Sequence, residues 1–354
     1  MKKIKKLLPF VIGIAGGGAI GGLMAAKADT LPQLALAMAL FFLSVYAQLI
    51  LHEAGHLIAG LLSGYRFVSF RIGSLMLLKS GGRYRLARFR LAGTGGQCLM
   101  APPPLRGSDY PNTLFHFGGS IMNLLWAILA AVMLITRGYS PWWVGTLAAG
   151  LFMAATNGIP LQISGIDNDG RNAIRSLKEE NVRLGFYRQL QVNAALSEGK
   201  RLREMPEEWF SCEAGQERER GFLRFQWMLD REEYARAYKY GQSLVSADLL
   251  GVNKALLEND LRCLSLLAGE ALSEPGALLK QYQKAMADYP AILRGKYIFA
   301  LLQEKDAEKA NKYRKQFEKN LKTYPYPSDV QTDIALMALA ARKHDNPSAP
   351  ADEI

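Results

Sequence analysis

An apolar stretch from Leu31 to Leu62 constrains the fold of this chain more than any other feature of the sequence. It is longer than the roughly 20 residues that a helix needs to cross a bilayer, and it holds hardly a polar residue. Near its end stands the run His52-Glu53-Ala-Gly-His56. Histidines four apart on a helix share one face and can bind a single zinc ion, and the glutamate between them can act on water at that metal. The sequence therefore predicts a metal site within a membrane helix.

Charge is distributed very unevenly along the chain. Up to Arg171 there are 15 Lys and Arg against 5 Asp and Glu, whereas the remaining residues contain 28 against 27. Nearly all of the net charge of +11 therefore lies beside the apolar segments. Cationic loops next to membrane helices are the positive-inside pattern, so the basic balance favours a membrane protein with the lipid bilayer as its surroundings. Nucleic-acid binding is not expected.

The apolar pattern predicts about four transmembrane helices. The first segment, about residues 7–26, follows a basic start and is interpreted as a retained helix, with a cleaved signal peptide as the alternative. The second is Leu31–Leu62, and the third and fourth cover about residues 117–135 and 143–160. The loop at residues 64–112 contains eight Lys and Arg and one acidic residue. This bias places the loop, the N-terminus and everything after the fourth span in the cytoplasm.

The same loop predicts a small membrane-associated β-ribbon over about residues 66–101. Residues 67–78 and 84–91 have strand patterns, and they flank Ser80-Gly81-Gly82, which is a hairpin turn signal. Arginine alternates with other residues through the second strand. One face of the ribbon would then contact lipid and the other water or phosphate headgroups.

A third zinc ligand is expected after the fourth span. Zinc that is held by two histidines in a catalytic site usually takes a carboxylate as well and leaves one position for water. Asp167 and Asp169 are the only acidic residues that follow a membrane helix ending on the same side as the two histidines. Pro160 and the nearby glycines break that helix, and broken backbone within a membrane is tolerated where it lines a protein cavity. The pattern alone leaves the choice between the two aspartates open.

Two motifs together resemble those of a known family. The HEAGH run is followed about a hundred residues later by Asn157-x-x-Pro160 and then by Asp169-Gly170. This combination resembles the site-2 protease family of intramembrane zinc metalloproteases. The resemblance covers about residues 31–172.

The resemblance implies a catalytic core made of the second, third and fourth spans. Zinc would be bound by His52, His56 and the motif aspartate, Glu53 would be the general base, and Asn157 would steady the scissile carbonyl. The run Gly118-Gly119-Ser120-Ile121-Met122-Asn123 resembles the family's glycine-rich packing motif, and the β-ribbon resembles the element that is thought to present substrate in extended form.

This chain departs from the family pattern in one place. Pro160 and Asp169 are nine residues apart, which is longer than usual, and Asp167 lies between them as a competing ligand. Asp169 is preferred because it keeps the glycine that follows the motif aspartate.

The resemblance implies a zinc-dependent endopeptidase of a cell membrane, and the small size of the chain favours a bacterial origin. Its substrates would be transmembrane segments of regulatory proteins, signal-peptide remnants or peptide precursors. One alternative is a membrane-anchored zincin that acts on non-membrane segments and takes its third ligand from a glutamate in the C-terminal half. The other is an inactive membrane scaffold.

The overall expectation is a mainly α polytopic protein with three parts: residues 1–30, 31–171 and 172–354. The last part is expected to be a cytoplasmic helical domain. Its apolar periodicity predicts helices at residues 232–244, 255–267, 278–286 and 306–321. Tyr289-Pro290 and Tyr324-Pro325 end two similar stretches 35 residues apart, which is near the tetratricopeptide period. A repeat domain of this kind, or else an irregular bundle, would offer a docking surface for a cytoplasmic partner.

Overall fold

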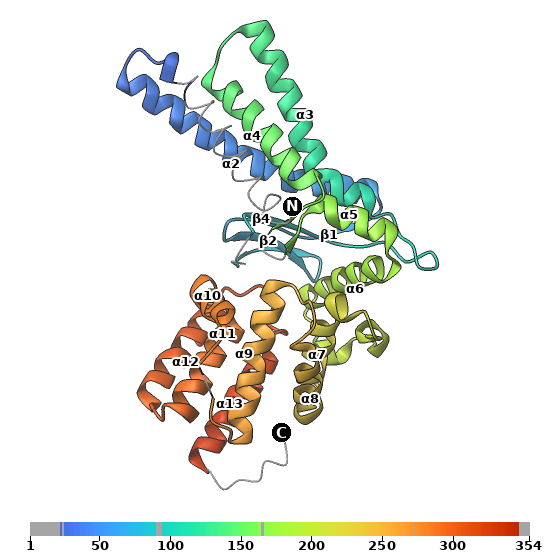
Figure 1. Cartoon of the computed structure of the whole chain (residues 1–354), viewed down its shortest axis with the longest axis vertical. Helices are drawn as coiled ribbons and strands as arrows, with labels where there is room; N and C mark the ends of the chain where they lie inside the picture. The colour runs from blue at the N-terminus through green and yellow to red at the C-terminus, as the bar shows by residue number, and fades with distance from the viewer. Residues whose placement is uncertain (1–21, 23–24, 90–93, 164–165, 273, 347–354) are drawn as a thin grey trace. The chain divides into compact units, whose positions relative to one another are not determined.

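The computed structural model describes residues 22, 25–89, 94–163, 166–272 and 274–346 (Figure 1). The chain forms two compact units. The first unit contains Met1–Ile72 and Gly95–Glu180, and the second contains Gly73–Thr94 and Asn181–Ile354. The transmembrane helix expected within residues 1–30 lies almost wholly outside the described residues.

Three helices form the body of the first unit: α2 (Leu31–Leu62), α3 (Thr113–Arg137) and α4 (Pro141–Gly158). They lie side by side and each contacts the other two (Figure 1). Helix α2 begins with a capping box, in which Thr30 accepts from the backbone of Gln33 and the Gln33 side chain bonds back. The outward faces of α2 and α3 expose many large apolar side chains, which is what lipid-facing surfaces require.

Among the described residues, α2 and α3 are the two helices that are long and apolar enough to cross a membrane. Helix α4 lies close to the expected fourth span, but it has only 18 residues and ends in Asn157-Gly158. The expected count of four spans is therefore not reproduced in the part of the chain that the structure describes, and the four-span topology stays a prediction.

The expected ribbon consists of two antiparallel strand pairs. Strand β1 (Arg66–Ile72) pairs with β4 (Gly96–Ala101) in the first unit. Strand β2 (Leu75–Ser80) pairs with β3 (Arg83–Arg88) in the second unit. The single strand expected over residues 67–78 is interrupted because the chain turns at Gly73, whose φ of +59° suits glycine.

The predicted hairpin turn at Gly81-Gly82 is present. Both glycines have positive φ, 54° and 75°, which is the requirement of the tight two-residue turns that match strand twist. The last two residues expected in the second strand, 90 and 91, lie outside the described residues.

A short connection leads from α4 to the next helix of the first unit. Strands β5 (Gln162–Ile163) and β6 (Ile166–Asp167) pair antiparallel, and helix α5 (Asp169–Lys178) begins directly afterwards. This small pair occupies the extra residues between Pro160 and Asp169 that distinguish the chain from the usual family spacing.

The second unit is mainly helical. Its helices are α6 (Glu180–Ser197), α7 (Phe222–Asp230), α8 (Tyr234–Leu244), α9 (Gly251–Ala268), α10 (Ala277–Ala285), α11 (Pro290–Ile298), α12 (Ala307–Leu321) and α13 (Gln331–Asp345). Four of them, α8, α9, α10 and α12, coincide with the helices expected from periodicity. The helices of this unit surround one continuous apolar core. A tetratricopeptide arrangement stays a prediction.

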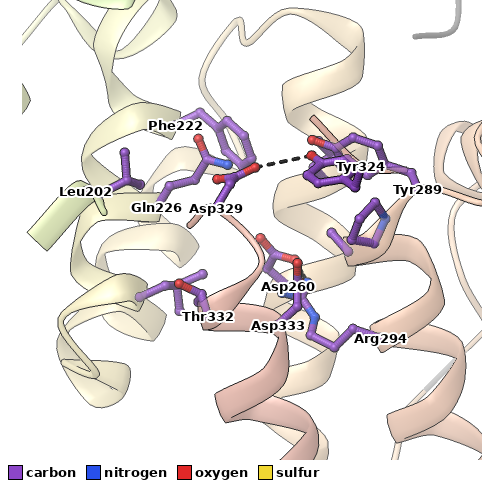
Figure 2. Close-up of a pocket in the computed structure, with 14 residues that line it drawn as sticks. Leu202, Phe222, Gln226, Asp260, Tyr289, Arg294, Tyr324, Asp329, Thr332 and Asp333 are labelled. Atoms are coloured by element: carbon purple, nitrogen blue, oxygen red, sulfur yellow. Dashed lines mark hydrogen bonds and ion pairs between the residues drawn. The ribbon is translucent and has the colours of Figure 1, made fainter. Parts of the chain in front are cut away.

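An ionic cluster is buried in this helical unit (Figure 2). Arg294 of α11 contacts Asp260 of α9 and lies 2.7 Å from Asp333 of α13. Asp329 lies nearby and accepts a hydrogen bond of 3.3 Å from the hydroxyl of Tyr324. Two carboxyl groups therefore pair with one guanidinium and a third lies in the same pocket, which is lined by all five of these residues.

Candidate metal centre

Three side chains of the first unit converge on one point. His52 and His56 lie one turn apart on α2, and their Nε2 atoms are 3.2 Å apart. Oδ2 of Asp169, the first residue of α5, lies 3.1 Å from Nε2 of His52 and 3.3 Å from Nε2 of His56. All three candidate ligand atoms fall within 4.8 Å of one another. Two imidazole nitrogens and one carboxylate oxygen, with a fourth position left for water, form the ligand set of a catalytic zinc site.

Hydrogen bonds orient both imidazoles towards that point. Nδ1 of His52 lies 2.7 Å from Oδ1 of Asn123, and Nδ1 of His56 lies 2.7 Å from the carbonyl oxygen of Phe115. Because these oxygens can only accept, each Nδ1 carries the proton and donates it. Each Nε2 therefore presents a lone pair to the centre, which is the tautomer that a metal ligand needs.

A chain of amides holds Asn123 in place. Its Nδ2 donates to the backbone oxygen of Gln48 at 2.8 Å and to Oε1 of the same residue at 2.7 Å. Nε2 of Gln48 in turn donates to the carbonyl oxygen of Thr146, 3.1 Å away. Asn123 and Gln48 are fully buried. The chain runs from α4 through α2 to α3 and thus fixes His52 relative to all three helices.

Glycines let α3 approach α2 at the centre. A Cβ atom on Gly119 would lie 2.5–2.6 Å from three atoms of the His52 ring. Gly118 faces the backbone of Gly55 one turn further along α2, where a Cβ on either residue would collide with the other. Close backbone approach at small residues is the usual packing of membrane helices. The glycine-rich run of α3 therefore serves both the helix contact and the site.

Glu53 is buried beside strand β4. Its carboxyl group lies against Gly96, where a Cβ atom would come within 2.5 Å of Oε1. Glu53 is 7% exposed, and it lies between the two converging histidines in the sequence of α2. The glycine at the start of β4 therefore makes room for this carboxyl group.

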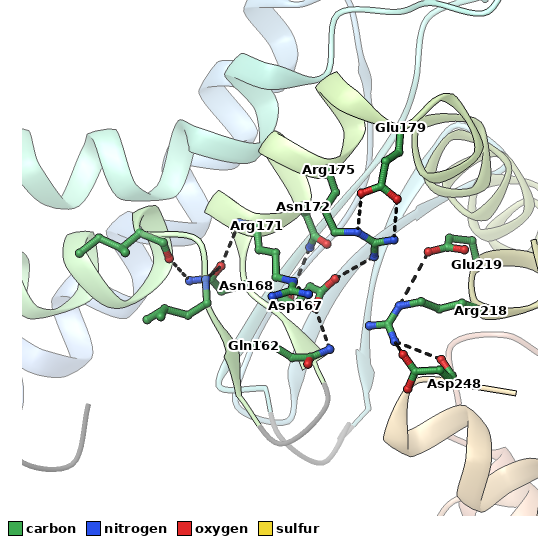
Figure 3. Close-up of polar contacts among 12 residues, drawn as sticks. Gln162, Asp167, Asn168, Arg171, Asn172, Arg175, Glu179, Arg218, Glu219 and Asp248 are labelled. Atoms are coloured by element: carbon green, nitrogen blue, oxygen red, sulfur yellow. Dashed lines mark hydrogen bonds and ion pairs between the residues drawn. The ribbon is translucent and has the colours of Figure 1, made fainter. Parts of the chain in front are cut away.

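The structure gives the two candidate aspartates different partners, and Figure 3 shows those of Asp167. Asp167 pairs with Arg171 and Arg175, each at 3.0 Å, and accepts from Nε2 of Gln162 at 3.0 Å. Its charge is thus balanced by cations of α5. Asp169 instead faces the two imidazoles.

Asn168 is responsible for this arrangement. Its Oδ1 accepts from the backbone nitrogens of Arg171 and Leu161, both at 3.0 Å, and so caps the first turn of α5. Its Nδ2 donates to the carbonyl oxygens of Thr156 and Ile159, both at 2.6 Å. This one side chain ties the end of α4 to the start of α5 and directs the next residue, Asp169, towards the histidines.

Asn157 is not drawn into the centre. Its Nδ2 donates to the carbonyl oxygen of Met153 in its own helix at 3.0 Å, and no hydrogen bond among the described residues joins it to His52, His56 or Asp169. Sequence reasoning had placed a catalytic role on Asn157. It gave no role of this kind to Gln48 or Asn123, for which the available signal was a pair of amides within apolar helices.

The model of peptidase family M50 matches residues 40–338, which include most of α2, all of α3 and α4, and most of the second unit. No curated protein and no solved structure matches the chain.

Proposed function

The chain belongs to peptidase family M50, the membrane metalloproteases of site-2 protease type, and we propose that it cleaves peptide bonds within membrane-embedded segments of anchored substrates. One observation carries this proposal. The ligand atoms of His52, His56 and Asp169 converge within 4.8 Å, and the two histidines lie on α2, a helix that is long and apolar enough to cross a membrane. A hydrolytic centre on such a helix would meet its substrates inside the bilayer.

His52, His56 and Asp169 are the proposed zinc ligands. The donor set fits the metal because both Nδ1 atoms are occupied by hydrogen bonds and both Nε2 atoms are free to bind. A zinc ion held there would supply Lewis-acid chemistry, acidifying water and polarising a carbonyl. Glu53 would take the proton from the attacking water and pass it to the leaving amine.

Asn157 keeps a proposed role in steadying the scissile carbonyl. For this its amide must give up the hydrogen bond to Met153, which a rotation of the half-buried side chain at the end of α4 would allow. Its contribution should be smaller than that of Glu53, because it would act only on a polarised carbonyl and would not transfer a proton.

Substrate would have to unwind before cleavage. Peptide bonds inside a helix are shielded by their own hydrogen bonds, and an extended segment can regain partners by pairing with strands. The strands β1 to β4 are the proposed surface for this pairing. Membrane-anchored regulatory proteins, signal-peptide remnants and peptide precursors are the proposed substrates.

The proposed setting is a bacterial cell membrane crossed about four times, with the N-terminus and the helical unit in the cytoplasm. The clustering of basic residues in the loop between α2 and α3 supports this orientation. The repeated Tyr-Pro stretches support a tetratricopeptide-like character of the helical unit, which could receive a cytoplasmic partner.

The test is cleavage of a reporter with one transmembrane segment by the purified protein in vesicles. Wild-type protein should cut within the membrane segment, as located by mass spectrometry of the products, and Glu53→Gln should abolish cleavage while zinc content is kept. Cuts confined to residues outside the membrane segment would instead support an anchored zincin. No cut in any reporter by zinc-loaded protein would support an inactive scaffold.

A further inference from the structure

The β2–β3 hairpin forms hydrogen bonds with the helical unit at both of its ends. In sequence the hairpin stands between β1 and β4 of the first unit, but it belongs to the second. Its turn is held by Glu198, just after α6, because the backbone nitrogen of Gly81 donates to Oε2 at 3.0 Å. At the other end the backbone nitrogen of Arg88 donates to the carbonyl oxygen of Thr323 at 3.2 Å. The hairpin is therefore fastened at both ends.

Phe89, directly after β3, packs against the core of the helical unit. Its ring centroid lies 5.9 Å from that of Tyr324, 6.0 Å from that of Tyr326 and 6.4 Å from that of Tyr289. These tilted and edge-on arrangements are the favourable geometries for aromatic pairs. Every other described member of this apolar core lies between Val192 and Ala340. Phe89 is thus the hairpin's contribution to a core that is otherwise built by the helices.

Tyr289, Tyr324 and Tyr326, named here the tyrosine seat, are fixed by other residues of the helical unit. Tyr289 and Tyr324 are the tyrosines of the two Tyr-Pro pairs, and their rings lie 6.4 Å apart. Tyr289 caps the start of α11, where Pro290 occupies the first turn. Tyr324 is 9% exposed, and its hydroxyl donates to Asp329 (Figure 2). The tyrosines of both Tyr-Pro pairs therefore contact the same residue, Phe89.

A further contact fixes the same end of the hairpin. The guanidinium of Arg85 donates to the carbonyl oxygen of Pro325 at 2.5 Å. Pro325 belongs to the second Tyr-Pro pair, so one short segment, residues 323–326, receives a backbone bond, a guanidinium and an aromatic ring from β3. Such a concentration of contacts makes this segment the main attachment point.

The hairpin is also joined through the chain to the metal centre. Strand β1 ends at Ile72, directly before the hairpin, and β4 begins at Gly96, whose backbone lies against the carboxyl group of Glu53. Both strands that flank the hairpin in sequence thus belong to the unit that contains the metal centre.

We propose that the helical unit is the receptor for the chain's own β2–β3 hairpin and that Phe89, held in the tyrosine seat, positions this hairpin for extended substrate. The part of this inference that concerns substrate rests on the proposed protease function. The part that concerns the seat does not.

Hydrogen exchange of the full-length protein in detergent tests the seat. In Phe89→Ala the amides of β2 and β3 should exchange roughly 10- to 100-fold faster, because a half-buried aromatic side chain no longer holds the hairpin against the helical unit. Phe89→Leu should restore much of the protection. Leu86→Ala is the matched control, since Leu86 lies on the same strand but is 70% exposed, and it should leave the exchange unchanged. Equal hairpin exchange in Phe89→Ala and wild type would overturn the proposal.

A second variant covers the case in which Phe89→Ala also loosens the helices. Arg85→Met removes the bond to Pro325 without opening the core, and it should speed exchange in β3 while the amides of α9 keep their protection. If Arg85→Met also leaves β3 unchanged relative to α9, the attachment is overturned.

Kinetics then test the positioning role. Phe89→Ala should raise KM for a membrane-anchored substrate about tenfold or more, change kcat less, and leave zinc content unchanged, with Phe89→Leu closer to wild type. A loosened hairpin with unchanged KM would overturn the positioning role. Failure of the wild-type protein to cleave any reporter would count against the proposed function, while the exchange measurements would still decide the seat.

Discussion

Replacing Asn123 with alanine tests the chain of amides that orients His52. The substitution removes the oxygen that lies 2.7 Å from Nδ1 of His52. It also removes the amide that donates to the backbone and side-chain oxygens of Gln48 at 2.8 and 2.7 Å. Both amide residues are fully buried. Because the bilayer interior holds no water, nothing can replace the lost hydrogen-bond partners. His52 would then be free to rotate and to place its proton on either nitrogen.

The expected magnitude follows from the role of these bonds. Loss of a partner behind a metal-binding histidine typically lowers metal affinity about 10- to 100-fold, which corresponds to about 1.4–2.7 kcal/mol. The effect should lie in the upper half of that range, because Asn123→Ala also leaves Gln48 without the donor that satisfies it. Activity at limiting zinc should fall in parallel, whereas saturating zinc should restore part of it.

The measurement is competition for zinc between the purified protein and a chromophoric chelator. Ser120→Ala is the matched control, because Ser120 lies one turn earlier on α3 and its buried hydroxyl has no hydrogen-bond partner among the described residues. It should bind zinc as the wild type does. An Asn123→Ala protein whose zinc affinity stays within about twofold of wild type, well short of the usual loss, would refute the assigned role of the amide chain.

Two further substitutions test other parts of the structure. Gly119→Ala should lower zinc content and cleavage at least about tenfold, since the new Cβ atom would lie 2.5–2.6 Å from the His52 ring and must displace that ring. Zinc analysis and the reporter assay check this prediction. Normal zinc content and normal cleavage would contradict the close approach of α3 to His52. Asp329 lies in the helical unit, where burial raises the pKa of its carboxyl group to about 6. Because the folded protein then holds a proton that the unfolded chain releases near pH 4, the helical unit should lose about 2 kcal/mol of stability as pH rises from about 4 through about 6. Asp329→Asn should weaken this dependence, as followed by hydrogen exchange of α9 to α13 across the pH range, whereas Asp333, whose carboxyl pKa burial raises to about 7, should keep the rest. An unchanged pH dependence in the variant would contradict the contribution of Asp329.

The convergence of the two histidines could be predicted from the sequence because it depends on spacing within a single helix. An i, i+4 pair stays on one face of a helix whatever the rest of the fold does. Asp169 was harder, since it and Asp167 lie two residues apart in the same polar stretch. What separates them is the cap that Asn168 places on α5 and the pairing of Asp167 with Arg171 and Arg175. These contacts follow from where a helix begins, which is the least certain part of a sequence-based prediction.

Contacts between distant segments were the other limit. The spacing of the Tyr-Pro pairs was interpreted as a repeat, which concerns each copy and its neighbours. The structure also brings both tyrosines to Phe89, which precedes them by some two hundred residues in the sequence. Likewise, nothing in the pattern of the loop indicated that β4 would place Gly96 against Glu53. Local periodicity carries no information about such partners.

The central claim is that His52, His56 and Asp169 hold one zinc ion within the membrane unit. Its most direct test is the zinc content of detergent-purified protein, comparing wild type with Asp169→Ala and with Asp167→Ala as the matched control. The account predicts about one zinc per chain in the wild type and in Asp167→Ala, and a clear loss in Asp169→Ala. Zinc retained by Asp169→Ala, or absent from all three proteins after reconstitution with the metal, would contradict it.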